Sequence, residues 1–283
     1  MIEQLSHKPL TAKRLVLSLL SAPGMDEVSV RELVRWAELF AIDAAALRVA
    51  IGRMVKAGLL RAPRRGVYRI GSGGEALRLA ARSWRAAEAR VVPWRGDWLV
   101  VHSEHLGRSN RSALRDRERV LNLEGMRPLQ SGLWIRPANY SEPMEATRQR
   151  MLGLGLEPGA LVLRVRELSG AGLEDLERLW PREALERDYR AFTSAMVESA
   201  ARLSALEIAE AARETFILGE AVIRLINADP LLPEQFVDVK ARGELIAGMM
   251  TYDSLGQSVW ERFRRVGDSA ARDTNTKRRQ KTA

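Results

Sequence analysis

The sequence predicts an α+β multidomain protein, and three observations support this class. At 283 residues, of which 46% are apolar, the chain can bury two or three separate cores. Apolar residues recur at helical spacing in the first and last thirds, whereas strand-like runs alternate with helical segments in the middle. Charge is unevenly distributed: residues 1–92 carry 16 Lys and Arg against 8 Asp and Glu, whereas residues 168–266 carry 12 against 17.

The composition excludes several kinds of chemistry. The chain has no cysteine, which excludes disulfides, thiolate catalysis and metal sites with cysteine ligands. The longest uncharged run, Leu15–Met25, spans 11 residues and contains Pro23, so it is too short for a membrane-spanning helix or a signal peptide. We therefore expect a cytoplasmic protein with no membrane partner.

Two helices are predicted in the first 40 residues. Thr11 begins the first helix, which ends before Pro23. Ser29 and Glu32 form a capping-box pattern that opens the second helix, because each side chain can satisfy an unpaired backbone N–H at the position of the other. The apolar residues expected to face inward are Leu15, Val16, Leu19 and Leu20 in the first helix, and Val30, Leu33, Val34 and Ala37 in the second.

A third helix is predicted after the turn Phe40–Asp43, because Asp43 is a favourable N-cap and Gly58 a favourable residue just beyond a helix end. A helix with a narrow apolar stripe and a basic free face can enter the major groove of DNA, and a glycine on that face lets it approach closely. The inner side is expected to consist of Leu47, Ile51, Met54 and Val55. The free face is expected to consist of Arg48, Val49, Gly52, Arg53 and Lys56.

A basic hairpin is predicted directly after this helix. Leu59–Ala62 and Val67–Ile70 have strand-like composition, and Pro63–Gly66 joins them. This connection places Arg64 and Arg65 at the tip of the hairpin, where they would lie along phosphates.

The order of these elements predicts a winged helix-turn-helix DNA-binding domain over residues 1–74. Each basic residue taken alone is explained equally well as solvated surface. Lys13 and Arg14, on the outer face of the first helix, either contact phosphates or remain solvated. The succession of capped helix, turn, basic helix, glycine and basic hairpin is more specific, and attraction to phosphates also explains the positive excess of residues 1–92.

Residues 75–92 are predicted to form a connector helix after the flexible break Gly71–Gly74. This helix packs either within the subunit or against a second subunit, and the sequence does not decide between the two. The residues along its apolar side are Leu77, Ala80, Ala81, Trp84 and Ala87.

Residues 93–170 change to alternating strands and helices. Their order, β-α-β-α-β, predicts a ferredoxin-like domain. The predicted strands are Trp98–His102, Gly132–Ile135 and Ala160–Val165, and the predicted helices are Ser109–Leu123 and Met144–Leu152.

Residues 171–266 are predicted to form a helical domain. Pro181 opens its first helix, and a capping-box pattern of Ser204 and Glu207 opens a second helix that continues to Asn227. Residues 267–283 are predicted to be a disordered basic tail. The apolar stripe of the first helix consists of Leu185, Tyr189, Phe192, Met196 and Leu203, and two short helices are expected at Ala241–Tyr252 and Gly256–Val266.

Four stretches of the chain resemble PaaX-type transcriptional regulators. Residues 10–20 and 47–60 resemble the family's opening segment and recognition helix, and residues 129–137 and 227–233 resemble its middle and carboxy-terminal signatures. The family's Trp-Pro-Gly motif is replaced by residues 236–240. The resemblance implies a repressor of phenylacetate catabolism that aryl-CoA thioesters release from DNA. It also implies a middle domain with the fold of small CRISPR-associated nucleases.

No residue pattern identifies the effector site that this resemblance implies. Trp134, Trp180, Arg182 and Tyr189 combine aromatic surface with positive charge, which suits an acyl-CoA effector. Aromatic residues at helical spacing are nevertheless part of a core more often than part of a pocket. No cofactor is expected apart from this CoA-thioester effector, and no metal.

We therefore expect a repressor that binds a palindromic double-stranded DNA operator as a homodimer and is released by an aryl-CoA or acyl-CoA effector. The alternative is a metal-dependent nuclease that uses the middle domain, with Glu104 and His105 as candidate ligands. The resemblance disfavours it, because His102-Ser103-Glu104 stands where the related nucleases carry a metal-binding aspartate. An acyl-CoA enzyme is a third interpretation, but no nucleophile with an adjacent base is visible.

Overall fold

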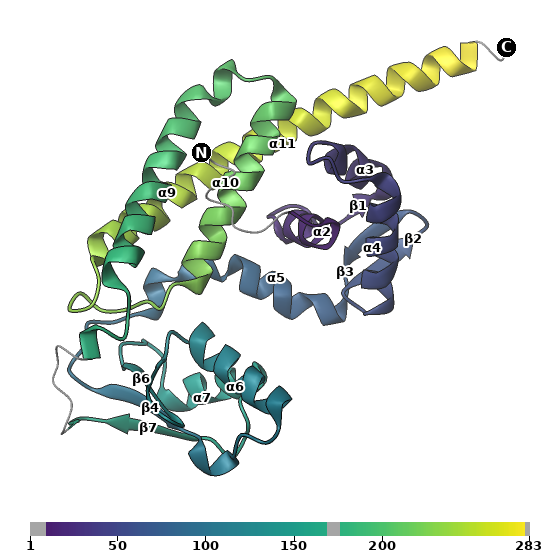
Figure 1. Cartoon of the computed structure of the whole chain (residues 1–283). Coiled ribbons are helices and arrows are strands. Elements are labelled where there is room, and N and C mark those ends of the chain that lie inside the picture. Colours follow the sequence, from purple (N-terminus) through teal and green to yellow (C-terminus); the bar gives the residue numbers. More distant parts are fainter. Residues whose placement is uncertain (1–9, 169–175, 281–283) are drawn as a thin grey trace. The chain divides into compact units, whose positions relative to one another are not determined.

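The residues that the computed structural model describes form nine α-helices and two antiparallel sheets (Figure 1), which confirms the predicted α+β class. These residues are 10–168 and 176–280, with side chains described up to residue 266. A helical segment with the length and apolar character of a membrane span does not occur among the described residues.

The chain divides into two units, and neither is a single continuous range. The first unit comprises the described residues of Met1–Trp84, Phe192–Asn227 and Ile246–Ala283. The second comprises those of Arg85–Ala191 and Ala228–Leu245. The amino-terminal elements therefore share a unit with later helical segments, whereas the domains expected from the sequence are contiguous.

Capping residues set the starts of the amino-terminal helices as predicted. Helix α2 (Ala12–Ser21) follows Thr11, whose side chain accepts a hydrogen bond from the Arg14 backbone N–H. Helix α3 (Val30–Glu38) opens with the capping box of Ser29 and Glu32.

The hairpin is also present, with a shorter turn than predicted. Strands β2 (Leu60–Arg64) and β3 (Val67–Ile70) flank a two-residue turn, and the short β1 (Val28–Ser29) pairs with the other side of β3. Pro63 therefore lies in β2 and not in the turn. The pairing register shifts between Arg61 and Arg64, and β2 is an edge strand, a position that tolerates proline.

Gly71–Gly74 does not form the flexible break that the sequence suggests. The backbone N–H groups of Gly71 and Gly73 donate to the carbonyl oxygens of Leu59 and Gly58, at 2.8 and 3.1 Å. A Cβ atom at Gly71 or Gly74 would collide with these same carbonyl groups. The glycines are therefore required by close backbone packing, and Ser72–Gly74 forms a short 3-10 helix.

The connector helix is shorter than predicted. Helix α5 (Glu75–Arg82) is followed by 3-10 turns at Ser83–Ala86 and Glu88–Arg90. Trp84 and Ala87 are buried as expected, but Leu77 and Ala80 are exposed. Arg82 fixes α5 to the end of α2 by donating hydrogen bonds to the carbonyl oxygens of Ser21 and Ala22.

The middle region contains one more strand than predicted. Its elements follow the order β4-α6-β5-β6-α7-β7, and the sheet has the order β5-β6-β4-β7 with every neighbouring pair antiparallel. The missed strand, β5, lies at the edge of the sheet and contains Pro128. The bounds are β4 Trp98–His102, α6 Arg111–Leu123, β5 Arg127–Gln130, β6 Leu133–Pro137, α7 Met144–Gly153 and β7 Leu161–Val165.

One hydrophobic core joins this sheet to its two helices. Leu99 and Val101 of β4 pack with Val120 of α6 and Met151 of α7. Helices α6 and α7 therefore cover the same face of the sheet.

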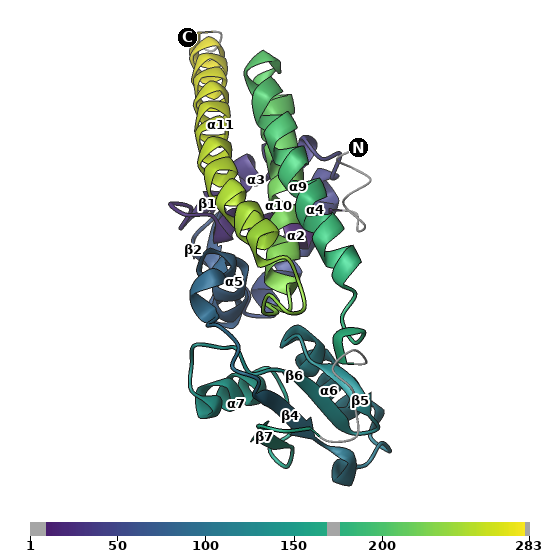
Figure 2. The same cartoon turned by 90° about the vertical axis from the view of Figure 1, so that its left-hand side faces the viewer.

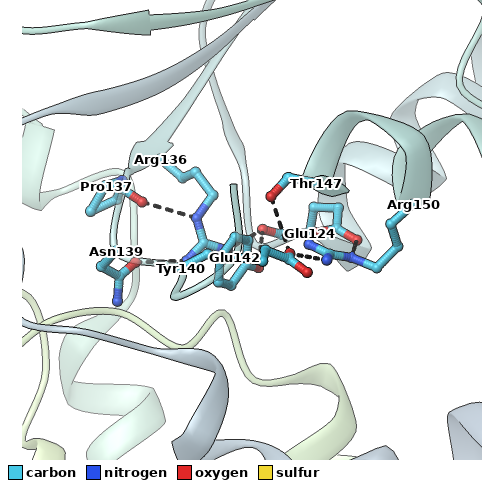
Figure 3. Close-up of polar contacts among 8 residues, drawn as sticks. All are labelled: Glu124, Arg136, Pro137, Asn139, Tyr140, Glu142, Thr147 and Arg150. Atoms are coloured by element: carbon cyan, nitrogen blue, oxygen red, sulfur yellow. Dashed lines mark hydrogen bonds and ion pairs between the residues drawn. The ribbon is translucent and has the colours of Figure 1, made fainter. Parts of the chain in front are cut away.

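A cluster of buried and partly buried polar side chains lies in the same unit (Figure 3). The Arg136 guanidinium is 3.7 Å above the Tyr140 ring and donates hydrogen bonds to the Tyr140 hydroxyl and, at 2.9 Å, to Asn139. Arg150 of α7 donates to the carboxylates of Glu124 and Glu142. Burial lowers the pKa of Arg136 and raises the pKa of Tyr140. The cluster connects β6, the end of α6 and α7.

Three long helices follow: α9 (Arg182–Arg202), α10 (Ile208–Ala228) and α11 (Val239–Gln280). Figure 2 shows them side by side. The buried residues of α9 include the predicted Tyr189, Phe192 and Met196, and Leu203 is buried just beyond its end.

The boundaries of these helices differ from the prediction in two places. Ser204 lies within the 3-10 turn Leu203–Ala205, so it does not open α10, which begins at Ile208. One continuous helix replaces the two predicted short helices, because α11 passes through Gly256 without a break. This helix also includes residues 267–280, which the sequence suggested to be disordered.

Candidate nucleic-acid interface

Helix α4 (Ala44–Lys56) presents the predicted basic face to solvent. Its opposite side buries Leu47, Ile51 and Met54, as expected. Val55 was predicted to join this inner side but is 37% exposed, because the apolar stripe is narrower than the sequence suggested. All five residues of the predicted free face are exposed: Arg48, Val49, Gly52, Arg53 and Lys56.

Local interactions fix both ends of α4. The Asp43 carboxylate accepts hydrogen bonds from the backbone N–H groups of Ala45 and Ala46, both at 2.9 Å. At the other end Gly58 has a φ of +70°, a conformation in which glycine carries no steric penalty. The free face of α4 therefore belongs to a helix whose two ends are both capped.

The positive charges of this face are not neutralised by any side chain in the part of the chain that the structure describes. Among the described residues, no ion pair and no side-chain hydrogen bond involves Arg48, Arg53 or Lys56. Arg65 at the hairpin turn is likewise exposed and without an ion pair in the described part of the chain. Arg64 is 72% exposed, with the carboxylate of Glu27 at 3.5 Å. These cations remain accessible to an anionic partner.

Lys13 and Arg14, which the sequence does not distinguish, have different environments. The Lys13 side chain is exposed. Arg14 forms a bidentate ion pair with Glu220 of α10, and its side chain is only 22% exposed. Arg14 therefore takes part in the packing of the first unit, whereas contact of Lys13 or Arg14 with phosphates stays a prediction.

Helix α3 is attached to the later helices of the first unit through aromatic residues that the sequence did not single out. Trp36 is fully buried and meets Trp260 of α11 edge-to-face, with 5.7 Å between ring centroids. The ring centroid of Phe40 lies 5.0 Å from that of Phe216 of α10. The Glu32 carboxylate, which caps α3, also pairs with Arg264 of α11 at 3.6 Å. The only sequence signal for this contact is the helical spacing of Trp36 with Leu33 and Ala37.

The segment that forms α2, α3, α4 and the hairpin also matches a known family. Residues 11–73 match the model described as "PaaX-like protein". This segment is PaaX-like. The match confirms the predicted resemblance over residues 11–73, and the stretches at residues 129–137 and 227–233 lie outside it.

Among solved structures, the chain is similar to the uncharacterized protein Rv0674 from Mycobacterium tuberculosis. The sequence identity is 22% and the TM-score is 0.55, and the similarity covers 87% of this chain and 99% of that chain. The likeness shows a shared fold. A comparison with curated proteins gave no significant match.

Outside the PaaX-like segment, the second unit contains a pocket of about 570 Å³. Trp180 and Arg182, two of the predicted effector residues, line it, together with Phe236. Arg178 and Arg187, which were not among the predicted effector residues, add positive charge to the pocket. Arginines lie on both sides of Pro181 in the sequence, and this pattern could have identified Arg178 and Arg187. The remaining lining residues are Glu177, Pro181, Glu183, Ala184 and Gln235.

The other two predicted effector residues do not line this pocket. The Tyr189 side chain is buried, and its hydroxyl donates a hydrogen bond to Asp229. Trp134 packs against the hydrophobic core of the β4–β7 sheet. The structure thus brings Trp180 and Arg182 together and assigns Tyr189 and Trp134 to packing.

The nuclease alternative gains no support from the strand end where its ligands were expected. His102 and His105 stack with 5.3 Å between ring centroids, and the His105 Nε2 is 2.8 Å from the Gly159 carbonyl oxygen. In the described ranges, no group of three or more His, Asp and Glu side chains is arranged to hold a metal ion.

Proposed function

We propose that this chain is a DNA-binding transcriptional regulator of the PaaX type that acts as a repressor and has no catalytic activity. The observation that carries the proposal is the free face of α4, where Arg48, Arg53 and Lys56 are exposed and have no ion-pair partner among the described residues. Several accessible cations on one helix face suit a polyanion such as DNA.

The arrangement around α4 suits a winged helix-turn-helix domain. In this proposal α3 and α4 are the two helices of the motif, α4 enters the major groove, and the hairpin β2–β3 is the wing. Arg48 and Arg53 donate hydrogen bonds to base edges, where a guanine offers the acceptors O6 and N7. Lys13, Lys56, Arg64 and Arg65 neutralise neighbouring phosphates.

The β4–β7 sheet fits the ferredoxin-like domain that the sequence predicts. Its chain order of β-α-β-β-α-β and its strand order β5-β6-β4-β7 are those of that topology, once the missed strand β5 is included. We assign no catalytic role to this domain.

A single α4 contacts only a few base pairs, so useful specificity requires two copies on one operator. We therefore propose a homodimer on a palindromic double-stranded DNA site, with half-sites about 10 bp apart or a multiple of that spacing. A two-fold symmetric protein then reads a two-fold symmetric sequence.

We further propose that the pocket of the second unit binds the effector, an acyl-CoA of the aryl-CoA type. Arg178, Arg182 and Arg187 suit the phosphates of CoA, Trp180 and Phe236 suit an aromatic acyl group, and about 570 Å³ is a usual volume for a ligand site. Release from DNA requires that the effector bind the DNA-competent and released forms with unequal affinity.

Helix α11 is our candidate for the coupling between effector and DNA. It begins at Val239, three residues after the lining residue Phe236, and its residues Trp260 and Arg264 contact α3. A change at the start of this helix can therefore reach the PaaX-like segment through a single continuous element.

Selection from a pool of random double-stranded DNA tests the proposal. The purified chain should enrich one sequence with two inverted half-sites, and phenylacetyl-CoA should release the chain from it. A chain that enriches no sequence contradicts the DNA-binding proposal. A chain that enriches a sequence but ignores aryl-CoA thioesters contradicts only the effector assignment.

A further inference from the structure

Val49 is an apolar residue at the centre of the basic face of α4, and no packing among the described residues explains it. Its side chain is 53% exposed. At 100° per residue, Val49 lies opposite the buried Leu47, Ile51 and Met54. β-Branched residues are weaker helix formers than alanine or leucine, so helix formation does not favour valine at this position either.

Gly52, one turn further along the same face, also lacks an explanation within the protein. A Cβ atom added to Gly52 would meet no other atom of the described residues within 4 Å, and the Gly52 backbone does not have a positive φ. Glycine is one of the two weakest helix formers, and an exposed site in the middle of a helix normally favours a residue with a side chain. The missing side chain is therefore understandable if a partner comes close at this position.

The charged side chains around Val49 limit the kind of partner surface that can contact this face. Arg53 lies on one side of Val49 and Arg48 on the other, and Lys56 follows further along the face. A partner that meets these side chains must offer anionic or acceptor groups around one apolar group. The major-groove edge of base pairs does so: it presents hydrogen-bond acceptors on guanine, phosphates on both sides, and one apolar group, the 5-methyl group of thymine.

We propose that Val49 reads the 5-methyl group of a thymine in each half-site, and that Gly52 gives the base edge the space to reach it. This inference rests on the proposed function, because it names the base recognised by the proposed recognition helix. It places a thymine beside the bases that Arg48 and Arg53 contact. Valine has no side-chain hydrogen-bonding group, so the methyl contact itself discriminates between bases.

Replacing thymine by deoxyuridine tests this contact, because it removes the methyl group and keeps the base pair. Each thymine of the selected operator is replaced in both half-sites, and dissociation constants are measured for the wild-type chain and for Val49→Ala. One position should weaken wild-type binding about fourfold for each methyl group lost from contact. The same replacement should have no effect on Val49→Ala. Uniform tolerance of deoxyuridine, or full sensitivity retained in Val49→Ala, overturns the proposal.

Gly52→Ala tests the close approach with two readouts of opposite sign. The substitution should raise the melting temperature, because alanine is the better helix former, and should lower operator affinity at least tenfold, because the new methyl group blocks the base edge. Gly153→Ala is the matched control, since Gly153 in α7 is also helical and exposed, and a Cβ there also meets nothing within 4 Å among the described residues. This control should raise stability and leave DNA affinity unchanged. A Gly52→Ala chain that binds like wild type contradicts close approach at this site.

The failure of this inference and that of the proposed function give different results. If the chain enriches no DNA sequence, both are overturned. If it enriches an operator that tolerates deoxyuridine at every thymine, DNA binding stands and only the reading of thymine by Val49 fails.

Discussion

Arg14 and Glu220 provide a prediction at the scale of single residues. Their bidentate ion pair is partly buried, and Arg224 also approaches Glu220, at 3.8 Å. Glu220→Ala leaves the Arg14 guanidinium without its carboxylate, so we expect the free energy of unfolding to fall by about 2 kcal/mol. Lys13→Ala, at an exposed position, should change it by less than about 0.5 kcal/mol.

Urea unfolding of the two variants measures this difference. Equal effects of Glu220→Ala and Lys13→Ala would show that the ion pair adds no stability. Operator binding provides a second comparison, because Lys13→Ala should weaken DNA binding at low salt.

Helix α4 and Arg14 show how much the sequence reveals about single residues. Helical spacing correctly places Leu47, Ile51 and Met54 inside and the basic residues of α4 outside. It does not reveal that Arg14 has a partner, because Glu220 lies 206 residues away in the chain. A side chain at the edge of a helix face is exposed or paired according to tertiary neighbours that local periodicity does not contain.

Tyr140 provides a prediction about how elements are held together. Its hydroxyl accepts a hydrogen bond from the buried Arg136 guanidinium, within the cluster that joins β6, α6 and α7. Tyr140→Phe removes this acceptor from a buried charge, so we expect a loss of about 1–3 kcal/mol of stability. Tyr68→Phe is the matched control, because among the described residues the Tyr68 hydroxyl has no hydrogen bond.

Chemical unfolding of both variants is the measurement. The control should stay within about 0.5 kcal/mol of wild type. A Tyr140→Phe chain as stable as the control would mean that Arg136 is satisfied without the tyrosine.

Element boundaries could be predicted where one local signal acts alone. Thr11, Ser29 and Asp43 cap the helices that they were expected to cap. Local sequence signals did not predict the boundary where tertiary packing competes with them. Gly256 resembles a helix break, yet it lies inside α11, where a Cβ atom would come within 3.6 Å of Thr215 on α10. The strand β5 was missed because it is short and contains Pro128, a combination that only an edge position tolerates.

At the scale of the whole molecule, two buried tyrosines and one partly buried tyrosine predict a loss of stability at alkaline pH. Burial raises the pKa of Tyr252 to about 12, and it also raises the pKa of Tyr140 and Tyr189. Below about pH 10 these phenols are protonated in both the folded and the unfolded chain, so stability is complete there. Above this pH the unfolded chain loses the protons first, so stability falls by about 1.4 kcal/mol per pH unit for each tyrosine.

The free energy of unfolding, measured from about pH 9 to pH 12, checks this dependence. In Tyr252→Phe, unfolding at alkaline pH releases one proton fewer, so the free energy of unfolding should fall less steeply with pH. It should also lower stability at neutral pH, because the hydrogen bond between Tyr252 and Ser199 is lost. An unchanged slope in Tyr252→Phe would show that Tyr252 does not remain protonated in the folded chain.

The organisation of the whole chain was the least predictable level. Sequence patterns suggested consecutive domains, whereas the first unit unites the amino-terminal segment with parts of α9, α10 and α11. Contacts such as Trp36 with Trp260 create this arrangement between residues that no local pattern relates. The basic face of α4 could be predicted because it depends only on one helix and its caps. The pocket could be anticipated only in part, because Trp180 and Phe236 come from separate segments of the second unit.

The most direct test of the DNA-binding claim is the affinity of the Arg48→Ala/Arg53→Ala double variant for the selected operator and for a scrambled duplex. Fluorescence anisotropy at one fixed salt concentration provides both dissociation constants. Arg111→Ala/Arg115→Ala is the control, because it removes the same charge from an exposed part of α6. We predict that the Arg48→Ala/Arg53→Ala variant loses roughly a hundredfold of operator preference with a nearly unchanged melting temperature, while the control keeps its preference. An Arg48→Ala/Arg53→Ala chain that still distinguishes its operator as well as wild type would contradict the account.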